Sequence, residues 1–249
     1  MNFLGIIPAR YRSSRFPGKP LVEIRGKTMI RHVYERASEA LSVVVVATDD
    51  ERIFREVERF GGRVVMTSPD HRSGTDRCAE ALEIFRKDHP GKKIDAVINI
   101  QGDEPLIRPE QLQEVMTLFN DPDTAIATLV HEHHGLSEIV NPNAVKAVMD
   151  KHGRVLYFSR SPIPFQRDVP QEKWGKYFTY LIHIGMYAYR ADVLREITRL
   201  EPSPLEKAES LEQNRWLENG YTIRAAISAY RNYSVDTPED LERILHLFE

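Results

Sequence analysis

The sequence has 249 residues, of which 41% are hydrophobic and 29% are charged, and its formal net charge is −3. These proportions are typical of a soluble globular protein that can bury a substantial core. The near-neutral charge balance argues against broad nucleic-acid binding. No stretch approaches the roughly eighteen apolar residues of a membrane span. The N-terminus does not resemble a signal peptide.

Cys78 is the only cysteine, so no disulfide can form within the chain. It lies in a stretch with helical character, where we expect a buried small hydrophobe. A single unpaired cysteine suits a reducing compartment, and we therefore expect a cytoplasmic protein.

The first half of the chain alternates between strand and helix patterns. We expect strands at 3–7, 43–47, 64–66 and 96–100, and helices at 29–40, 50–60, 74–85 and 109–120. The β-branched run 43–47 is typical of a strand buried on both faces. This order predicts an α/β fold with a doubly wound, mainly parallel, Rossmann-like sheet and right-handed crossovers.

The second half is less regular. We expect strands at 125–130, 144–149, 155–158, 183–189 and 223–227, helices at 205–219 and 238–247, and a long polar connection at 162–177. No repeat or linker is apparent. We interpret residues 1–249 as a single domain with a less regular lobe for substrate binding and dimerisation at about 131–190.

A basic loop follows the first expected strand. The region contains a single acidic residue, Glu23, and six basic residues: Arg10, Arg12, Arg15, Lys19, Arg25 and Lys27. Backbone N–H groups and fixed cations at the end of such a strand favour phosphate binding. The alternative is a solvated basic loop.

Asp103 follows the strand at 96–100, within Gln-Gly-Asp-Glu-Pro. Gly102 permits an unusual backbone conformation, and Pro105 prevents the turn from merging with the strand or the next helix. A rigidly held carboxylate beside bound phosphate is suited to Mg²⁺. The alternative is an ordinary acidic turn.

Asp236 stands directly before a helix start. Thr237 suits the N-cap, Pro238 the first turn, and Glu239 and Asp240 the positive end of the helix dipole. None of these roles involves Asp236, whose side chain is therefore free to act elsewhere.

Two acidic or histidine-rich tracts have simpler interpretations than metal binding. Asp121-Pro122-Asp123 resembles the Asp-x-Asp of metal-dependent glycosyltransferases, but a Pro-containing turn favours Asp in any case. The tract from His131 to His134 lacks the spacing of a closed zinc site, so we expect a polar loop or a dimer contact. The phosphate-binding motif of P-loop kinases is absent.

The basic loop also resembles the nucleotide-binding loop of sugar nucleotidyltransferases, and within them the cytidylyltransferases that activate 3-deoxy-manno-octulosonate (KDO) with CTP. The shared blocks are Ile-Ile-Pro-Ala-Arg and Pro-Gly-Lys-Pro-Leu at 6–21, Gln-Gly-Asp-Glu-Pro at 101–105, Asn-Pro-Asn-Ala-Val-Lys at 141–146, Phe-Ser-Arg at 158–160, Pro-Ser-Pro-Leu-Glu at 202–206, and Val-Asp-Thr-Pro-Glu-Asp-Leu at 235–241. They extend over nearly the whole chain.

The resemblance implies a reaction in which KDO attacks the α-phosphate of CTP, giving CMP-KDO for lipopolysaccharide biosynthesis and pyrophosphate. It implies a homodimer, and Mg²⁺ shared by Asp103 and Asp236. The loop with Pro8 and Ala9 holds the nucleotide, and Arg10, Arg15 and Lys19 hold the triphosphate. The segment from His71 to Arg77 lines the cytidine pocket, with Ser73 and Gly74 near the base and Arg77 nearby. Ser73 or Thr75 can also simply cap a helix.

The resemblance further assigns a set of polar residues to the sugar acid: Gln101, Arg160, His183, Tyr187, Glu212 and Gln213. His183 and Tyr187 share a strand face, and Arg160 suits a carboxylate. From the residues alone, surface or core positions are equally open. No general base is evident. The rival functions are transfer to another sugar, glycosyl transfer through Asp121 and Asp123, and nucleotide binding without catalysis.

Overall fold

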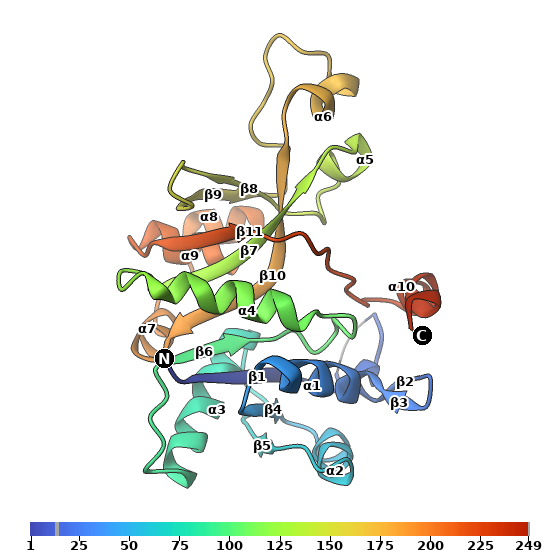
Figure 1. Ribbon diagram of the computed structural model, residues 1–249, viewed down its shortest axis with the longest axis vertical. Coiled ribbons are helices and arrows are strands. Elements are labelled where there is room, and N and C mark those ends of the chain that lie inside the picture. Colours follow the sequence, from blue (N-terminus) through green and yellow to red (C-terminus); the bar gives the residue numbers. More distant parts are fainter. Residues whose placement is uncertain (13–14, 249) are drawn as a thin grey trace. The chain divides into compact units, whose positions relative to one another are not determined.

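The computed structural model describes residues 1–12 and 15–248, which form two compact units (Figure 1). Unit 1 contains Met1–Gln113, Ala188–Thr198 and Asn232–Glu249, and unit 2 contains Glu114–Tyr187 and Arg199–Arg231. Each unit has its own strands and core.

Unit 1 is built on four parallel strands in the order β6-β1-β4-β5. Their bounds are β1 Phe3–Ala9, β4 Val44–Thr48, β5 Val64–Met66 and β6 Ala96–Asn99. All five residues of β4 are buried, as the β-branched run predicts. The parallel, doubly wound arrangement that we expected is confirmed here.

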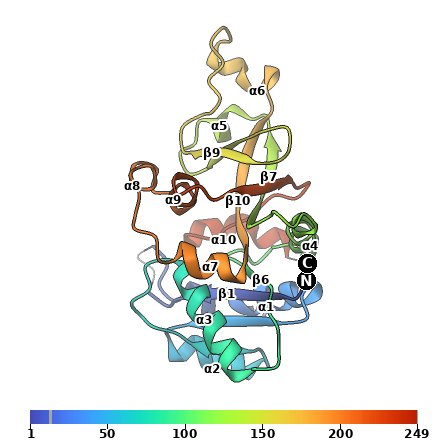
Figure 2. The same ribbon diagram turned by 90° about the vertical axis from the view of Figure 1, so that its left-hand side faces the viewer.

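The helices of unit 1 begin and end close to their expected positions. They are α1 Met29–Ala40, α2 Glu51–Arg59, α3 Gly74–Asp88, α4 Pro109–Thr117 (which enters unit 2) and α10 Pro238–Ile244. A further helix of unit 1, α7 Ala191–Ile197, was not predicted. Figure 2 shows α1 and α3 on opposite sides of β1, as in a doubly wound fold. Cys78, in α3, is free and buried, as expected.

Short elements complete unit 1 around its C-terminal helix. They are the 3₁₀ turns η1 Lys19–Leu21 and η4 Leu245–Leu247, and the hairpin β2 Glu23–Ile24 and β3 Lys27–Thr28, which we did not predict. Ile24, Met29, Leu106 and Val235 form one buried cluster with Ile244 of α10 and with Phe248. This cluster anchors the segment that carries Asp236.

Unit 2 combines parallel and antiparallel strands. They are β7 Ile126–His133, β8 Lys146–Met149, β9 Val155–Ser159, β10 Tyr180–Arg190 (whose last residues belong to unit 1) and β11 Ile223–Ile227. β11 pairs with β7 in parallel, whereas β8 pairs with β9 and β10 antiparallel. The remaining elements are η2 Leu118–Asn120, α5 Leu136–Ile139, η3 Gln171–Lys173, α6 Trp174–Tyr177, α8 Pro204–Glu209 and α9 Glu212–Glu218.

Three expectations for unit 2 are wrong. The helix expected at 205–219 is two helices, because Ser210 adopts the left-handed conformation (φ +52°) between α8 and α9. The connection at 162–177 contains η3 and α6. Of the two interpretations of the tract from His131 to His134, the polar loop is wrong, because residues 131–133 end β7 and His131 and His133 are buried. The dimer contact stays a prediction.

Candidate active site

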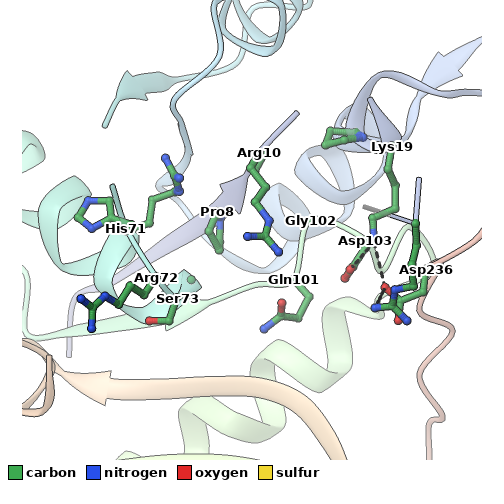
Figure 3. A pocket seen from close by; sticks show the side chains of 15 residues that line it. Pro8, Arg10, Lys19, His71, Arg72, Ser73, Gln101, Gly102, Asp103 and Asp236 are labelled. Atoms are coloured by element: carbon green, nitrogen blue, oxygen red, sulfur yellow. Dashed lines mark hydrogen bonds and ion pairs between the residues drawn. The ribbon is translucent and has the colours of Figure 1, made fainter. Parts of the chain in front are cut away.

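A cavity of about 350 Å³ in unit 1 is lined by all the residues that we predicted to bind nucleotide (Figure 3). Its lining comprises Pro8, Ala9, Arg10, Arg15, Lys19, Pro20, His71, Arg72, Ser73, Gly74, Arg77, Gln101, Gly102, Asp103 and Asp236. The predicted nucleotide and metal residues, and Gln101, therefore lie around one space. Sequence reasoning did not single out His71, Arg72 or Pro20 as lining residues, although the first two belong to the segment it had selected.

The basic loop begins where β1 ends and turns back at Gly18. Gly18 has φ +72°, and its N–H donates to the Tyr11 carbonyl at 2.9 Å. The left-handed conformation favours glycine and starts η1, which carries Lys19. Only 12% of the Lys19 side chain is exposed, so its ammonium group has a restricted position at the cavity.

Lys19 joins the two predicted metal carboxylates. Its Nζ donates to Asp103 Oδ2 at 2.7 Å and to Asp236 Oδ1 at 3.3 Å, and Arg15 Nη2 lies 3.1 Å from the same Asp236 oxygen. Figure 3 shows Lys19, Asp103 and Asp236 at one end of the cavity, and the labelled residues His71, Arg72 and Ser73 at the other end. Two carboxylates, Lys19 and four arginines thus line one polar space; the arginines are Arg10, Arg15, Arg72 and Arg77.

The segment of Asp236 is fixed by its backbone. The Val235 N–H donates to the Asp103 carbonyl at 2.9 Å, and the Asp236 and Thr237 N–H groups donate to the Asp240 carboxylate. Thr237 caps α10 in a capping box, as predicted. The Asp236 side chain takes no part in the cap, so it is available to the cavity.

Position 102 requires glycine because a side chain there would collide with the backbone of Pro8, and not because of its backbone conformation. Its φ is not positive, so the left-handed region that glycine permits is not used there; a Cβ at this position would lie 3.0 Å from the Pro8 carbonyl oxygen. The close approach brings the Gln-Gly-Asp turn against the end of β1. The same tight packing recurs at Gly74, where a Cβ would lie 3.3 Å from the Pro8 ring.

A buried carboxyl group stands next to Asp103. Glu104 is 5% exposed, and its Oε1 accepts a hydrogen bond from Asn232 Nδ2 at 2.8 Å. Burial, reinforced by the charge of Asp103, raises the pKa of Glu104 to about 8. At neutral pH this group is mainly uncharged, so it adds little negative charge beside Asp103.

Ser73 and Arg77 both have structural partners as well as a place on the cavity. Ser73 is the N-cap of α3 in a capping box with Asp76, which decides between the two caps we considered. Arg77 is buried and donates to Thr67 Oγ1 at 2.6 Å and to Asp49 Oδ2 at 3.1 Å. Arg77 therefore presents a fixed, pre-oriented guanidinium group.

The predicted sugar residues other than Gln101 lie in unit 2. The His183 and Tyr187 rings are 5.1 Å apart, as the shared strand face predicts, and Tyr187 packs edge-on against Trp216. Thr128 Oγ1 lies 3.0 Å from His183 Nε2, and burial lowers the pKa of His183 to about 3. His183 is therefore neutral at physiological pH and suits a hydroxyl group better than a carboxylate.

Arg160, Glu212 and Gln213 lie around the junction of α8 and α9. Arg160 follows β9 and donates from its guanidinium group to the carbonyls of Pro142, Glu209 and Ser210. Glu212 Oε1 accepts from Arg215 Nη2 at 2.7 Å, and Gln213 is 6% exposed. These residues are thus held in place by their neighbours in unit 2.

The alternative metal tracts do not form sites. Asp121 pairs with Arg224 Nη2 at 2.5 Å and accepts from the Asp123 N–H, as expected for a turn. Among residues 1–12 and 15–248, no three His, Cys, Asp or Glu side chains are grouped as a metal site. Within the same residues, no helix has the length and apolar character needed to cross a membrane.

Comparison with known proteins agrees with this geometry. The family model described as Cytidylyltransferase matches residues 4–223. The 3-deoxy-manno-octulosonate cytidylyltransferase of Phocaeicola vulgatus is 56% identical over 98% of this chain and 96% of its own length, and that of Bacteroides thetaiotaomicron is 55% identical over 97% and 96%. A solved CMP:2-keto-3-deoxy-manno-octonic acid synthetase in complex with CTP is 44% identical, with a TM-score of 0.90 over 99% of this chain and 98% of that one.

Proposed function

The chain belongs to the cytidylyltransferase family and catalyses the CTP-dependent activation of KDO, and we propose that the cavity of unit 1 holds the CTP for this transfer. The anomeric hydroxyl group of KDO attacks the α-phosphate in line, and pyrophosphate leaves. The observation that carries the proposal is the cluster of Lys19, Asp103 and Asp236, lined by further cations in one cavity.

The cations Arg10, Arg15 and Lys19 bind the triphosphate. They neutralise the charge that accumulates on the leaving pyrophosphate, which is the main contribution a protein makes to phosphoryl transfer. Lys19 is bound to two carboxylates in the structure, so its ammonium group is already oriented before the nucleotide arrives. Pro8, Ala9, Ser73, Gly74 and Arg77 form the remainder of the nucleotide site.

Asp103 and Asp236 suit Mg²⁺. Magnesium prefers one or two protein carboxylates, with phosphate oxygens and water as the other ligands, so a site of two carboxylates beside a triphosphate fits it. The backbone bond between Val235 and Asp103 holds the two segments together. The ion, when bound, neutralises phosphate charge and polarises the α-phosphate.

The sugar acid is bound by Gln101, Arg160, His183, Tyr187, Glu212 and Gln213. Arg160 pairs with its carboxylate, and neutral His183 with a hydroxyl group. The product supplies KDO for lipopolysaccharide biosynthesis. We also propose a cytoplasmic homodimer; one buried free cysteine suits a reducing compartment, and Phe165 and Tyr177 in unit 2 are 72% and 62% exposed, as subunit contacts often are.

The reaction is tested with purified protein, CTP, KDO and Mg²⁺. We expect stoichiometric release of pyrophosphate and CMP-KDO, and loss of both when excess chelator removes the metal. Activity that survives the chelator would contradict the magnesium site. Release of a nucleoside diphosphate or monophosphate in place of pyrophosphate would indicate a glycosyltransferase.

A further inference from the structure

Lys146 has a position in unit 2 that its side-chain chemistry does not favour. It lies in β8 and is completely buried, although lysine is rarely found in protein interiors. Its Nζ donates to the carbonyl oxygens of Asn141 at 2.9 Å, Ala144 at 2.6 Å and Arg160 at 2.5 Å. An ammonium group has three N–H bonds, so each one is satisfied. Lys146 therefore links two backbone segments, and one of them carries Arg160.

Glu209, the last residue of α8, holds the same segment from the other direction. Its Oε2 accepts from the backbone N–H of Arg160 at 2.9 Å, and its Oε1 accepts from Ser159 Oγ at 2.6 Å. Lys146 thus fixes the carbonyl group of Arg160 while Glu209 fixes its N–H group. The backbone of Arg160 is restrained on both sides by charged, hydrogen-bonded groups.

The guanidinium group of Arg160 is oriented by the end of α8. Nε donates to the Glu209 carbonyl at 2.7 Å, Nη2 to the Ser210 carbonyl at 3.3 Å and Nη1 to the Pro142 carbonyl at 2.9 Å. A guanidinium group has five N–H bonds, and these contacts leave one on each terminal nitrogen. That pair can bind both oxygens of a carboxylate.

The charges of this cluster also favour an anionic ligand. Lys146 and Arg160 contribute two positive charges and Glu209 one negative charge, so the three side chains carry a net charge of +1. α9 begins two residues after the left-handed Ser210 and carries Glu212 and Gln213, which we assign to the same sugar. Glu138 also lies within electrostatic reach of Lys146, so the positive charge of Arg160 is the one that a carboxylate ligand would meet most directly.

We propose that Lys146 and Glu209 are positioning residues for KDO binding: they hold Arg160 in the single orientation in which it receives the carboxylate of the sugar acid. Neither side chain touches the sugar. This inference rests on the proposed function in one respect, the assignment of Arg160 to the KDO carboxylate.

The test compares Lys146→Met, Glu209→Ala, Glu209→Gln and Arg160→Ala with the wild-type protein. Lys151→Met is the matched control, because Lys151 is an exposed lysine on the turn between β8 and β9. For each protein we measure the KM for KDO, kcat, the calorimetric Kd for CTP and the thermal midpoint. Production of CMP-KDO by the wild-type protein tests the proposed function separately.

We expect Lys146→Met and Glu209→Ala to raise the KM for KDO about tenfold or more, since small displacements of a binding group are costly. The Kd for CTP should stay within about twofold of wild type. Glu209→Gln should recover most of the affinity for KDO, because an amide can bond to both the Arg160 N–H and the Ser159 hydroxyl.

An unchanged KM for KDO in folded Lys146→Met and Glu209→Ala, with a raised KM in Arg160→Ala, would overturn the inference but not the sugar site. A lower thermal midpoint with normal KDO saturation would reduce both residues to a structural role. If Lys146→Met does not fold, the pair of Glu209 variants decides alone, because Glu209 is only partly buried. An unchanged KM in Arg160→Ala would remove the premise and the inference together.

Discussion

The replacement of Asp103 or Asp236 by asparagine separates the proposed catalytic role of these carboxylates from any role in folding. The substitution preserves shape and one acceptor oxygen but removes the negative charge. At 2.7 and 3.3 Å from Lys19 Nζ, the two carboxylates interact with it by roughly 6 and 5 kcal/mol at an effective dielectric constant near 20. Desolvation and competition with water cancel most of this energy during folding.

The expected effect on stability is therefore small. The Asp103 and Asp236 side chains are 29% and 39% exposed, and ion pairs open to solvent contribute about 1 kcal/mol or less. A loss of that size lowers the thermal midpoint by about 2–4 °C in a chain of this length. Turnover should respond far more strongly, because in the proposed mechanism these charges hold the Mg²⁺ that neutralises the triphosphate.

We expect each variant to lower kcat/KM for CTP by about 10²-fold or more, which corresponds to about 2.7 kcal/mol of lost transition-state stabilisation. The measurement is pyrophosphate release over a magnesium titration, combined with thermal denaturation. Asp123→Asn is the control, since Asp123 is an exposed acid in the turn of the rival metal motif. If Asp236→Asn unfolds the protein but leaves turnover per folded molecule intact, our assignment is wrong and Asp236 is structural.

Two further predictions concern the sugar site. Arg160→Lys should recover only part of the KDO affinity lost in Arg160→Ala, because an ammonium group cannot bind both oxygens of a carboxylate as a guanidinium group does. Equal losses of CTP and KDO affinity in Arg160→Ala would instead assign Arg160 to the phosphate site. His183→Gln should flatten the pH dependence of stability. The pKa of folded His183 is about 3 and that of an unfolded histidine about 6.5, so below pH 6.5 the unfolded state binds more protons and wild-type stability falls with falling pH. Between pH 6.5 and 5.0 the difference amounts to about 2 kcal/mol, measured by urea denaturation, and parallel curves for the two proteins would contradict it.

The first half of the fold could be predicted because its signals are local. A short apolar run such as β4 is buried on both faces, and an amphipathic stripe such as that of α1 packs one face. The prediction of a phosphate-binding loop rests on the same kind of local signal, since a parallel strand that ends in a basic, glycine-containing loop favours an anionic ligand. Neither inference needed knowledge of distant contacts.

The junction of α8 and α9 could not be predicted in this way. Residues 205–219 are compatible with one continuous helix, and no proline or glycine interrupts them. The break coincides with contacts from Arg160, which binds the carbonyls of Glu209 and Ser210 from about fifty positions earlier in the chain. Such an interaction stabilises free carbonyl groups at a helix end but leaves no pattern in the helix sequence.

Asp236 and Lys146 differ in what the sequence could reveal about them. Every neighbour of Asp236 has a role in starting α10, so the one residue without such a role is conspicuous. Lys146 follows Asn-Pro-Asn-Ala-Val, where a lysine raises no question until its complete burial is known. The cost of burying an ammonium group is offset only when its donors are all satisfied, as they are here by three carbonyls. The buried ammonium group of Lys146 therefore holds the backbone around it in a defined position, and its shortest hydrogen bond goes to the carbonyl oxygen of Arg160.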